Sequence, residues 1–313
     1  MKQCCKSILI YVVTVIVFSA APTTARGSDE IPGLKSVCLE SGITLHYVEQ
    51  GTGQPIIFVH GSLSDLTYWH DQMEPLGERY RVIAYSRRYN WPNRNQISPN
   101  YSAVTDAEDL AGLIGKLHLG PIYLVGHSYG ALTAMFLIAK HPELVKAAVL
   151  AEPPLVPLLR NLSEPDSARG NALYADIQAH MVVPMKREFK QGRTEAGTAA
   201  FIDYMFDDPQ GWQKLDAASQ ADTLKDAHEW DVIMTGGKLF PGIPISKIKE
   251  VHVPVLLMTG GKSQEFLQLI DIELARLLPD SQSVVFEDSG HQMWMQHPKE
   301  ARDDADAFFR KHP

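Results

Sequence analysis

A serine flanked by two glycines stands near the middle of the chain, in the sequence LVGHSYGALTAMF at residues 124–136. An apolar run enters this segment, and a run of small and apolar residues with helical character leaves it. Gly-x-Ser-x-Gly between a buried strand and a helix forms a sharp turn that exposes the serine above the sheet. Side chains larger than those of Gly126 and Gly130 would collide with the adjacent strand and helix. Ser128 is therefore predicted to be a nucleophile.

A serine hydroxyl is a weak nucleophile and needs a base beside it. His291 follows a strand-like run and the turn EDSG, late in the chain. We predict that this histidine accepts the serine proton and later passes it to the leaving group. Two other histidines compete for the role. His127 adjoins the serine within the turn and is expected to point elsewhere, and His60 lies in a different loop.

Short apolar runs alternate with helix-like stretches along most of the chain. Wholly apolar strands are typical of a parallel sheet that helices cover on both faces. The alternation of strands and helices predicts a doubly wound, mostly parallel α/β sheet. The runs that indicate strands lie at residues 56–60, 80–86, 122–127, 146–152, 253–260 and 282–287.

The alternation stops after Pro153, and no convincing apolar strand follows until about Ile248. Helix-like pieces fill this stretch, so we expect a helical cap at residues 153–248. The α/β core would then consist of residues 26–152 and 249–313. The methionine and aromatic side chains of the cap are expected to form mostly its own core, with some of them lining an apolar substrate pocket.

Three segments resemble the α/β-hydrolase superfamily, and the resemblance extends from about Val37 to the C-terminus. FVHGSLSDLTYW at 58–69 is similar to its His-Gly oxyanion loop, LVGHSYGA at 124–131 to its nucleophile elbow, and FEDSGHQMWMQHP at 286–298 to the loop that carries its histidine. Nucleophile, acid and histidine also follow in the order expected for this fold. The resemblance implies the α/β-hydrolase fold with a helical cap insertion.

The resemblance also implies an oxyanion hole, in which two backbone N–H groups stabilise the developing negative charge. The Tyr129 amide, directly after the nucleophile, is expected to supply one donor. The Ser62 amide, directly after His60 and Gly61, is expected to supply the other, and His60 and Gly61 are expected to support the loop.

The acid that orients the histidine departs from the common pattern of the superfamily. Ser263 stands after the strand at 253–260, where an aspartate usually stands, and a serine cannot stabilise an imidazolium by charge. We predict that Glu152 is the acid, because it ends a buried strand and a histidine partner would offset the cost of burying its charge. Glu265 is the alternative acid, and Asp288 is a further candidate.

A serine in the elbow predicts an acyl-enzyme, so the expected reaction is hydrolysis of a small ester, thioester or lactone. Two alternatives stay open: carbon–carbon bond hydrolysis by the same residues, and a ligand-binding or receptor-type protein with little turnover. No cofactor and no metal are expected, because the chain lacks a P-loop, a dinucleotide fingerprint in the right setting and a His-Glu-x-x-His pattern.

The composition is that of a globular protein, with 45% hydrophobic and 21% charged residues among 313. The formal net charge of −8 argues against nucleic acid as a partner, because binding to phosphates needs basic patches. A small, partly apolar molecule is the expected substrate. Arg87 and Arg88 follow a strand end and could bind a carboxylate, but surface ion pairs are the favoured interpretation.

The N-terminus has the order typical of a secretory signal peptide. Lys2 and Lys6 precede an apolar run at residues 8–18, which small residues follow, and the run is short for a membrane span. We expect residues 1–25 to be cleaved and the protein to be periplasmic or secreted, with an uncleaved anchor as the alternative. Cys38 is the single cysteine after residue 25, so no intramolecular disulfide is expected.

Overall fold

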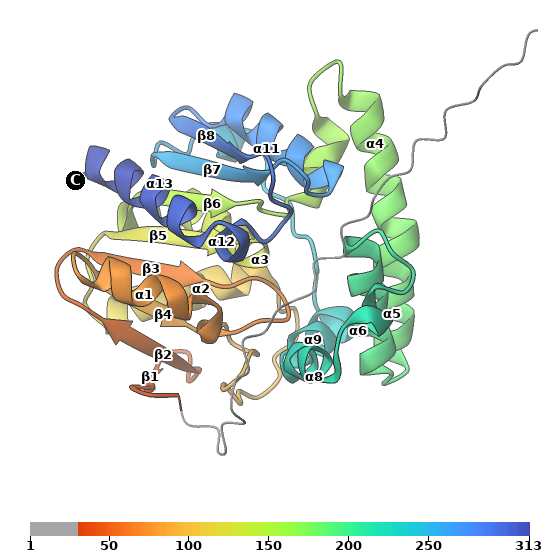
Figure 1. Ribbon diagram of the computed structural model, residues 1–313, viewed down its shortest axis with the longest axis horizontal. Coiled ribbons are helices and arrows are strands. Elements are labelled where there is room, and N and C mark those ends of the chain that lie inside the picture. The colour runs from red at the N-terminus through yellow and green to blue at the C-terminus, as the bar shows by residue number, and fades with distance from the viewer. Residues whose placement is uncertain (1–30) are drawn as a thin grey trace, which may run out of the picture. The chain divides into compact units, whose positions relative to one another are not determined.

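The computed structural model describes residues 31–313, and the predicted signal peptide lies outside them. Residues 33–313 contain an eight-stranded sheet, whose strands lie in the order β1-β2-β4-β3-β5-β6-β7-β8 (Figure 1). The pairs β1–β2 and β2–β4 are antiparallel, and the remaining pairs are parallel. The strands are β1 (Lys35–Cys38), β2 (Thr44–Gln50), β3 (Pro55–Val59), β4 (Arg81–Tyr85), β5 (Ile122–His127), β6 (Val145–Ala151), β7 (Val255–Gly260) and β8 (Ser281–Phe286).

Helices cover both faces of the sheet, which explains why its central strands are mostly apolar. In Figure 1, α1 and α13 lie in front of the sheet and α3 lies behind it. Every residue of β5 and β7 is buried. The helical elements of the core are η1 (Leu66–Trp69), α1 (His70–Gly77), α2 (Ala103–Lys116), α3 (Tyr129–Lys140), η2 (Pro142–Leu144), α11 (Glu265–Leu277), α12 (Met293–Gln296) and α13 (Pro298–Lys311).

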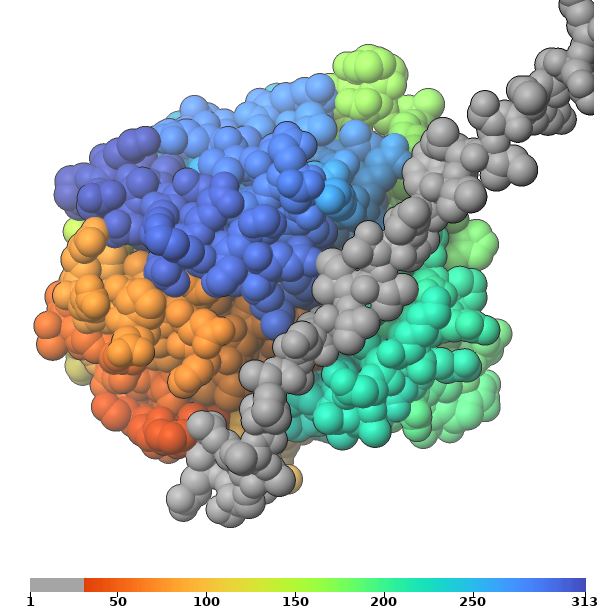
Figure 2. Space-filling view, in the orientation of Figure 1, coloured from red at the N-terminus to blue at the C-terminus, as the bar shows by residue number. Residues whose placement is uncertain are grey.

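The segment between β6 and β7 contains helices and no strand, and it forms the cap. Its α4, η4 and α5 follow one another without a break, as the long green helix of Figure 1 shows. In Figure 2 the green and teal surface of the cap lies beside the blue and orange surface of the core. The cap elements are η3 (Val156–Asn161), α4 (Ser167–Asp176), η4 (Ile177–Val182), α5 (Val183–Lys190), α6 (Thr194–Met205), α7 (Gly211–Lys214), α8 (Ala217–Lys225), α9 (His228–Gly236) and α10 (Ile245–Lys249).

This architecture confirms the predicted doubly wound α/β fold with a helical cap insertion. The parallel register brings the carboxyl ends of neighbouring strands to one edge: His127 pairs with Ala151, and Ala151 pairs with Met258. Residues that directly follow β5, β6 and β7 therefore lie close together, although the chain separates them widely. No helix in the described part of the chain is long and apolar enough to cross a membrane.

Candidate active site

The turn between β5 and α3 holds Ser128 in a backbone conformation that residues other than glycine rarely adopt, with φ 54° and ψ −123°. Its amide donates to the carbonyl of Ala151 at 2.8 Å, which ties the turn to the end of β6. Glu152 and Leu63 also have positive φ, of 49° and 52°. Such conformations cost of order 1–3 kcal/mol each and tend to occur at functional sites. The strain at these three positions marks one edge of the sheet as a candidate site.

The two glycines of the turn are required by close backbone approach. A Cβ at Gly130 would lie 2.2 Å from the carbonyl oxygen of Val59 and 2.5 Å from that of His60. A Cβ at Gly126 would lie 2.7 Å from Ala131 Cα within the following helix. The neighbouring strand and helix are therefore the elements that exclude side chains here.

Replacing Gly130 with alanine is expected to destabilise the protein by about 3 kcal/mol or more, because backbone atoms of β3 and its loop would have to move. Gly115→Ala is a matched control, since a Cβ there meets nothing within 4 Å near the end of α2. The control is expected to be neutral or to stabilise by up to about 1 kcal/mol. Urea unfolding of both variants measures the difference, and equal midpoints would contradict the prediction.

The loop after β3 lies directly against the turn. A Cβ at Gly61 would lie 3.1 Å from Ser128 Cβ, so the loop and the serine are in van der Waals contact range. The Ser62 amide finds no acceptor within the described residues. Tyr129 is the first residue of α3, and amides in the first turn of a helix lack an acceptor within the helix. The two amides predicted as oxyanion donors are thus placed on the two segments that flank Ser128.

His60 supports this loop from within the core, where it is fully buried. The backbone N–H of Arg87 donates to His60 Nε2 at 3.0 Å, so the ring proton must sit on Nδ1, which donates to the carbonyl of Gly61 at 2.8 Å. Burial, together with the positive charge of Arg87, holds the pKa of His60 well below 6.5. His60 is therefore a neutral donor with a defined tautomer.

His291 follows β8 and contacts Glu152, which follows β6. His291 Nδ1 is hydrogen-bonded to Glu152 Oε2, and the other carboxylate oxygen accepts from the Gly260 amide at 2.8 Å. Glu152 is fully buried, whereas the side chain of His291 is 18% exposed. The carboxylate thus has a partner on each oxygen, and His291 Nε2 makes no hydrogen bond within the described residues.

The other two candidate acids point away from His291. Glu265 lies at the start of α11 and pairs with Arg169 of α4, with Nε to Oε1 at 2.8 Å. Asp288 is exposed and pairs with Lys262 at 3.0 Å. Ser263 is half-buried, and its hydroxyl oxygen has no partner within the described residues. The structure therefore brings Glu152 to His291 and does not bring Glu265 or Asp288 there.

His127, which directly precedes Ser128 in the chain, contacts His291. His127 Nε2 donates to the main-chain carbonyl of His291 at 2.8 Å, and the two rings lie 4.6 Å apart. The His127 ring also stacks on the Tyr68 ring, with their centroids 5.2 Å apart, and the Tyr68 hydroxyl donates to Gln292 at 3.0 Å. Burial and the neighbouring His291 lower the pKa of His127 to about 3, so the ring is neutral.

The Ser128 hydroxyl makes no hydrogen bond to His291 in the described structure. Catalytic hydrogen bonds are often long in proteins without substrate and shorten in the complex. The sequence did not single out His127 or Tyr68 as supports of the histidine loop. The position of His127 beside the serine could have indicated a supporting role, but its partner, the carbonyl of His291, lies 164 residues away in the chain.

Arg87 and Arg88 are buried, and the interpretation of surface ion pairs was wrong for both. Arg87 is fully buried and pairs with Asp106 of α2 at 3.0 Å and with Glu229 of α9. Arg88 forms a two-point ion pair with Asp109, at 2.6 and 2.7 Å. Both arginines are paired with carboxylates of the protein itself.

Asp106 carries a raised pKa in this buried cluster. Burial is the largest cause, the positive charge of Arg87 opposes it, and the nearby carboxylates of Glu229 and Asp109 add to it, so that the pKa rises from 3.8 to about 7. Tyr101 donates its hydroxyl proton to the same carboxylate at 2.7 Å. Because the folded protein binds this proton more tightly than the unfolded chain, the contribution of Asp106 to stability is complete below about pH 4 and is lost as the pH rises through 7.

As the pH rises from 4 to 8, the free energy of unfolding of Asp106→Asn is therefore expected to fall less than that of the parent protein, because asparagine does not titrate. One proton changes the free energy of unfolding by at most about 1.4 kcal/mol per pH unit. Urea unfolding of both proteins at four pH values measures the difference. A stability difference that stays constant across this range would contradict the raised pKa.

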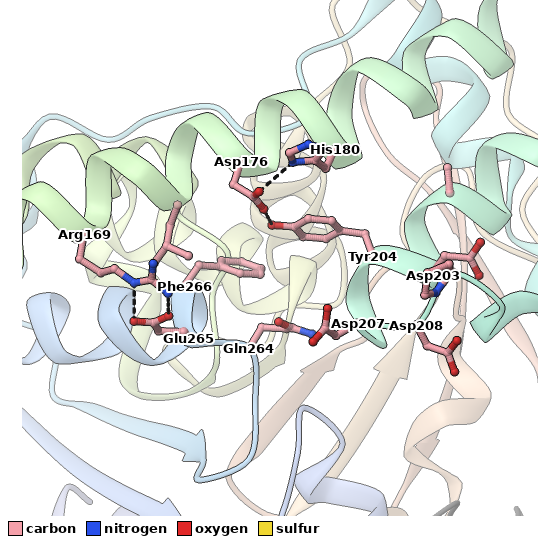
Figure 3. Close-up of a pocket in the computed structure, with 13 residues that line it drawn as sticks. Arg169, Asp176, His180, Asp203, Tyr204, Asp207, Asp208, Gln264, Glu265 and Phe266 are labelled. Carbon is pink, nitrogen blue, oxygen red and sulfur yellow. Dashed lines mark hydrogen bonds and ion pairs between the residues drawn. The ribbon is translucent and has the colours of Figure 1, made fainter. Parts of the chain in front are cut away.

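A pocket of about 510 Å³ lies between the cap helices α4 and α6 and the start of α11. Figure 3 shows Arg169 and Glu265 paired at one end, and Asp176 held between His180 and Tyr204. The pocket contains neither Ser128 nor His291 in its lining. Within residues 31–313, no group of three or more His, Cys, Asp or Glu side chains is placed to hold a metal ion.

Residues 56–304 match the alpha/beta hydrolase family, and the chain belongs to this family. The uncharacterized hydrolase YraK of Bacillus subtilis is 34% identical over 120 residues, which cover 38% of this chain and less than half, 44%, of YraK. The 2-(acetamidomethylene)succinate hydrolase of Mesorhizobium japonicum is 28% identical over 80% of this chain and 85% of its own.

Among solved structures, the enol-lactonase of Burkholderia xenovorans superposes with a TM-score of 0.68 at 18% identity. The superposition covers 88% of this chain and all of that one. At this identity the likeness shows a common fold. The relatives named here are described as hydrolases or as a lactonase, and this chain is a member of the alpha/beta hydrolase family.

Proposed function

We propose that this protein is a serine hydrolase that cleaves a small ester, thioester or lactone through an acyl-enzyme on Ser128. The contact of His291 Nδ1 with the buried Glu152 carboxylate, beside the strained serine turn, is the observation that carries the proposal. A serine, a carboxylate and a histidine, following one another along the chain in that order, together with two unpartnered amides, are the parts that acyl transfer requires. The hydrolase relatives support a small-molecule substrate.

In the proposed reaction, Ser128 Oγ attacks the substrate carbonyl carbon while His291 Nε2 takes the hydroxyl proton. The carbonyl electron pair moves to oxygen, and the amides of Ser62 and Tyr129 stabilise its negative charge. The bond to the leaving group then breaks, and the imidazolium gives its proton to the departing alcohol or thiol. Water, deprotonated by His291, attacks the acyl-serine, releases the acid and restores the Ser128 hydroxyl.

Glu152 has two tasks in this scheme. As an acceptor at Nδ1, it keeps the histidine in the tautomer whose Nε2 can accept the serine proton. Its negative charge also stabilises the imidazolium that forms. The Gly260 amide holds the second carboxylate oxygen, which fixes the orientation of the carboxylate plane.

Labelling with a fluorophosphonate tests the proposal, because this reagent needs an activated serine and an oxyanion site. We expect one adduct, found by intact mass and located on the peptide that contains Ser128. A panel of p-nitrophenyl esters, thioesters and lactones then defines the substrate. Failure to label, or labelling of a different serine, would contradict the proposal. Labelling without turnover of any panel member would favour the carbon–carbon hydrolase or the ligand-binding alternative.

Export is part of the proposal and stands on the N-terminal sequence. Residues 1–25 are proposed as a signal peptide that is cleaved, which would place the enzyme in the periplasm or outside the cell. Fractionation followed by N-terminal sequencing tests this. A chain that retains residues 1–25 in the membrane fraction would indicate the uncleaved anchor instead.

A further inference from the structure

The guanidinium of Arg87 holds the loop that carries the predicted oxyanion donor Ser62. Arg87 follows β4, and its side chain is fully buried. Its Nη2 donates to the carbonyl of Gly61 at 3.0 Å, and its Nε donates to that of His60 at 3.3 Å. The guanidinium carbon also lies 4.9 Å from the centre of the Tyr129 ring. One arginine thus contacts both segments that flank Ser128.

The carbonyl of Gly61 and the amide N–H of Ser62 belong to the same peptide unit. That bond is trans, so the carbonyl and the N–H point in opposite directions within one plane. The carbonyl accepts two hydrogen bonds, from His60 Nδ1 at 2.8 Å and from Arg87 Nη2 at 3.0 Å. These donors fix the plane of the peptide, and they polarise it so that the Ser62 N–H becomes a stronger donor.

A carboxylate from the cap sets the orientation of this arginine. Glu229 of α9 is fully buried and binds both terminal nitrogens of Arg87, with Nη2 to Oε2 at 2.9 Å. The side-chain amide of Asn90 donates to the same carboxylate at 3.3 Å. A planar two-point pair of this kind fixes the guanidinium more tightly than a single contact.

We propose that Glu229 is a positioning residue of the oxyanion hole, acting through Arg87 on the Gly61–Ser62 peptide. The inference rests on the proposed serine hydrolase function and adds that the cap controls the strength of one oxyanion donor. A cap that moved away from the core would separate Glu229 from Arg87 and weaken the Ser62 amide as a donor. Glu229 itself does not touch the reacting atoms.

The chain offers a matched control for a test. Arg88 and Asp109 form a second buried two-point pair, which makes no contact with the Gly61 carbonyl. Glu229→Gln and Asp109→Asn each remove one negative charge from such a pair. Full-length protein carrying either change is compared with the parent for thermal unfolding, for kcat and KM on one reactive ester, and for fluorophosphonate labelling.

We expect Glu229→Gln to lower kcat by about tenfold or more with KM within twofold, since a weakened oxyanion donor acts in the transition state. Labelling of Ser128 should slow by a similar factor. Asp109→Asn is expected to lose thermal stability while its kcat stays within twofold of the parent. Glu229→Asp keeps the charge on a shorter side chain, so its kcat should fall between those of the parent and of Glu229→Gln. This variant also tests the proposal if Glu229→Gln fails to fold.

A thiono ester provides a readout that a general structural role would not move. An oxyanion hole favours oxygen over sulfur because its donors are placed for the shorter bond. The ratio of ester to thiono ester rates should therefore fall in Glu229→Gln and stay unchanged in Asp109→Asn. An unchanged ratio and kcat in Glu229→Gln, with an active parent, would overturn this inference alone. A parent that neither labels nor turns over would overturn both it and the proposed function.

Discussion

Ser128→Ala is expected to lower kcat for ester hydrolysis by about 10⁴- to 10⁶-fold, the range seen when a catalytic serine is removed. The variant has no hydroxyl to form the acyl-enzyme, so the oxyanion donors and His291 can at most assist attack by water. Fluorophosphonate labelling should disappear. Steady-state kinetics with an active-site titration of the parent protein measure both effects.

A control serine separates loss of the nucleophile from loss of structure. Ser263 is half-buried and follows β7 at the site's edge, and its hydroxyl oxygen has no partner within the described residues. Ser263→Ala should therefore keep kcat within about twofold and remain fully labelled, since it removes no hydrogen bond. If Ser128→Ala retained more than a tenth of the parent rate, another residue would be the nucleophile.

Glu152→Gln is expected to lower kcat by about 10³- to 10⁴-fold, as in other triads whose acid becomes an amide. The amide carries no charge to stabilise the imidazolium. It also offers an N–H toward Nδ1, which favours the tautomer with its proton on Nε2, and that tautomer cannot accept the proton of Ser128. Glutamine retains a carbonyl oxygen for the Gly260 amide, so much of the local packing is preserved.

Glu265→Gln is the matched control for the acid. Glu265 is exposed, and its partner is Arg169 of the cap. Losing an exposed ion pair changes stability by about 1 kcal/mol or less, and we expect kcat to stay within about twofold. The opposite ranking of the two variants would assign the acid to Glu265. Equal small effects would mean that His291 acts without either carboxylate.

The local elements of the fold could be predicted because each follows from short stretches of sequence. Apolar runs such as residues 56–60 predict buried parallel strands wherever they alternate with helical segments. The absence of such runs after Pro153 predicted the helical cap between β6 and β7. The turn around Ser128 was also readable, because Gly126 and Gly130 are needed for backbone contacts that any such turn between strand and helix makes.

Partners that are distant in sequence could not be predicted in the same way. Glu152, Glu265 and Asp288 were all candidate acids, because each follows a strand or a turn near the same edge. The choice among these acids depends on where each side chain points. Glu152 lies inside the fold against His291, whereas Glu265 pairs with Arg169 of the cap. Which of them meets His291 is decided by the tertiary structure.

Arg87 shows the limit of local patterns most clearly. Two adjacent arginines after a strand are typical of an exposed loop, and the sequence alone indicated surface ion pairs. Burial of Arg87 depends on Glu229, which is 142 residues later in the chain and belongs to the cap. A charged side chain is buried only when partners offset its loss of hydration, and those partners are unknown until the chain has folded.

The sequence by itself determined the class of fold, the order of strands and helices along the chain, and the choice of Ser128 and His291 as the proposed nucleophile and base. These depend on hydrophobic periodicity and on turn geometry, which act over a few residues. Only the tertiary structure decided which carboxylate meets His291, why Arg87 is buried, and how the cap reaches the Gly61–Ser62 peptide. Those contacts join segments that are more than 100 residues apart, and their energies depend on burial and direction, which no short stretch of sequence contains.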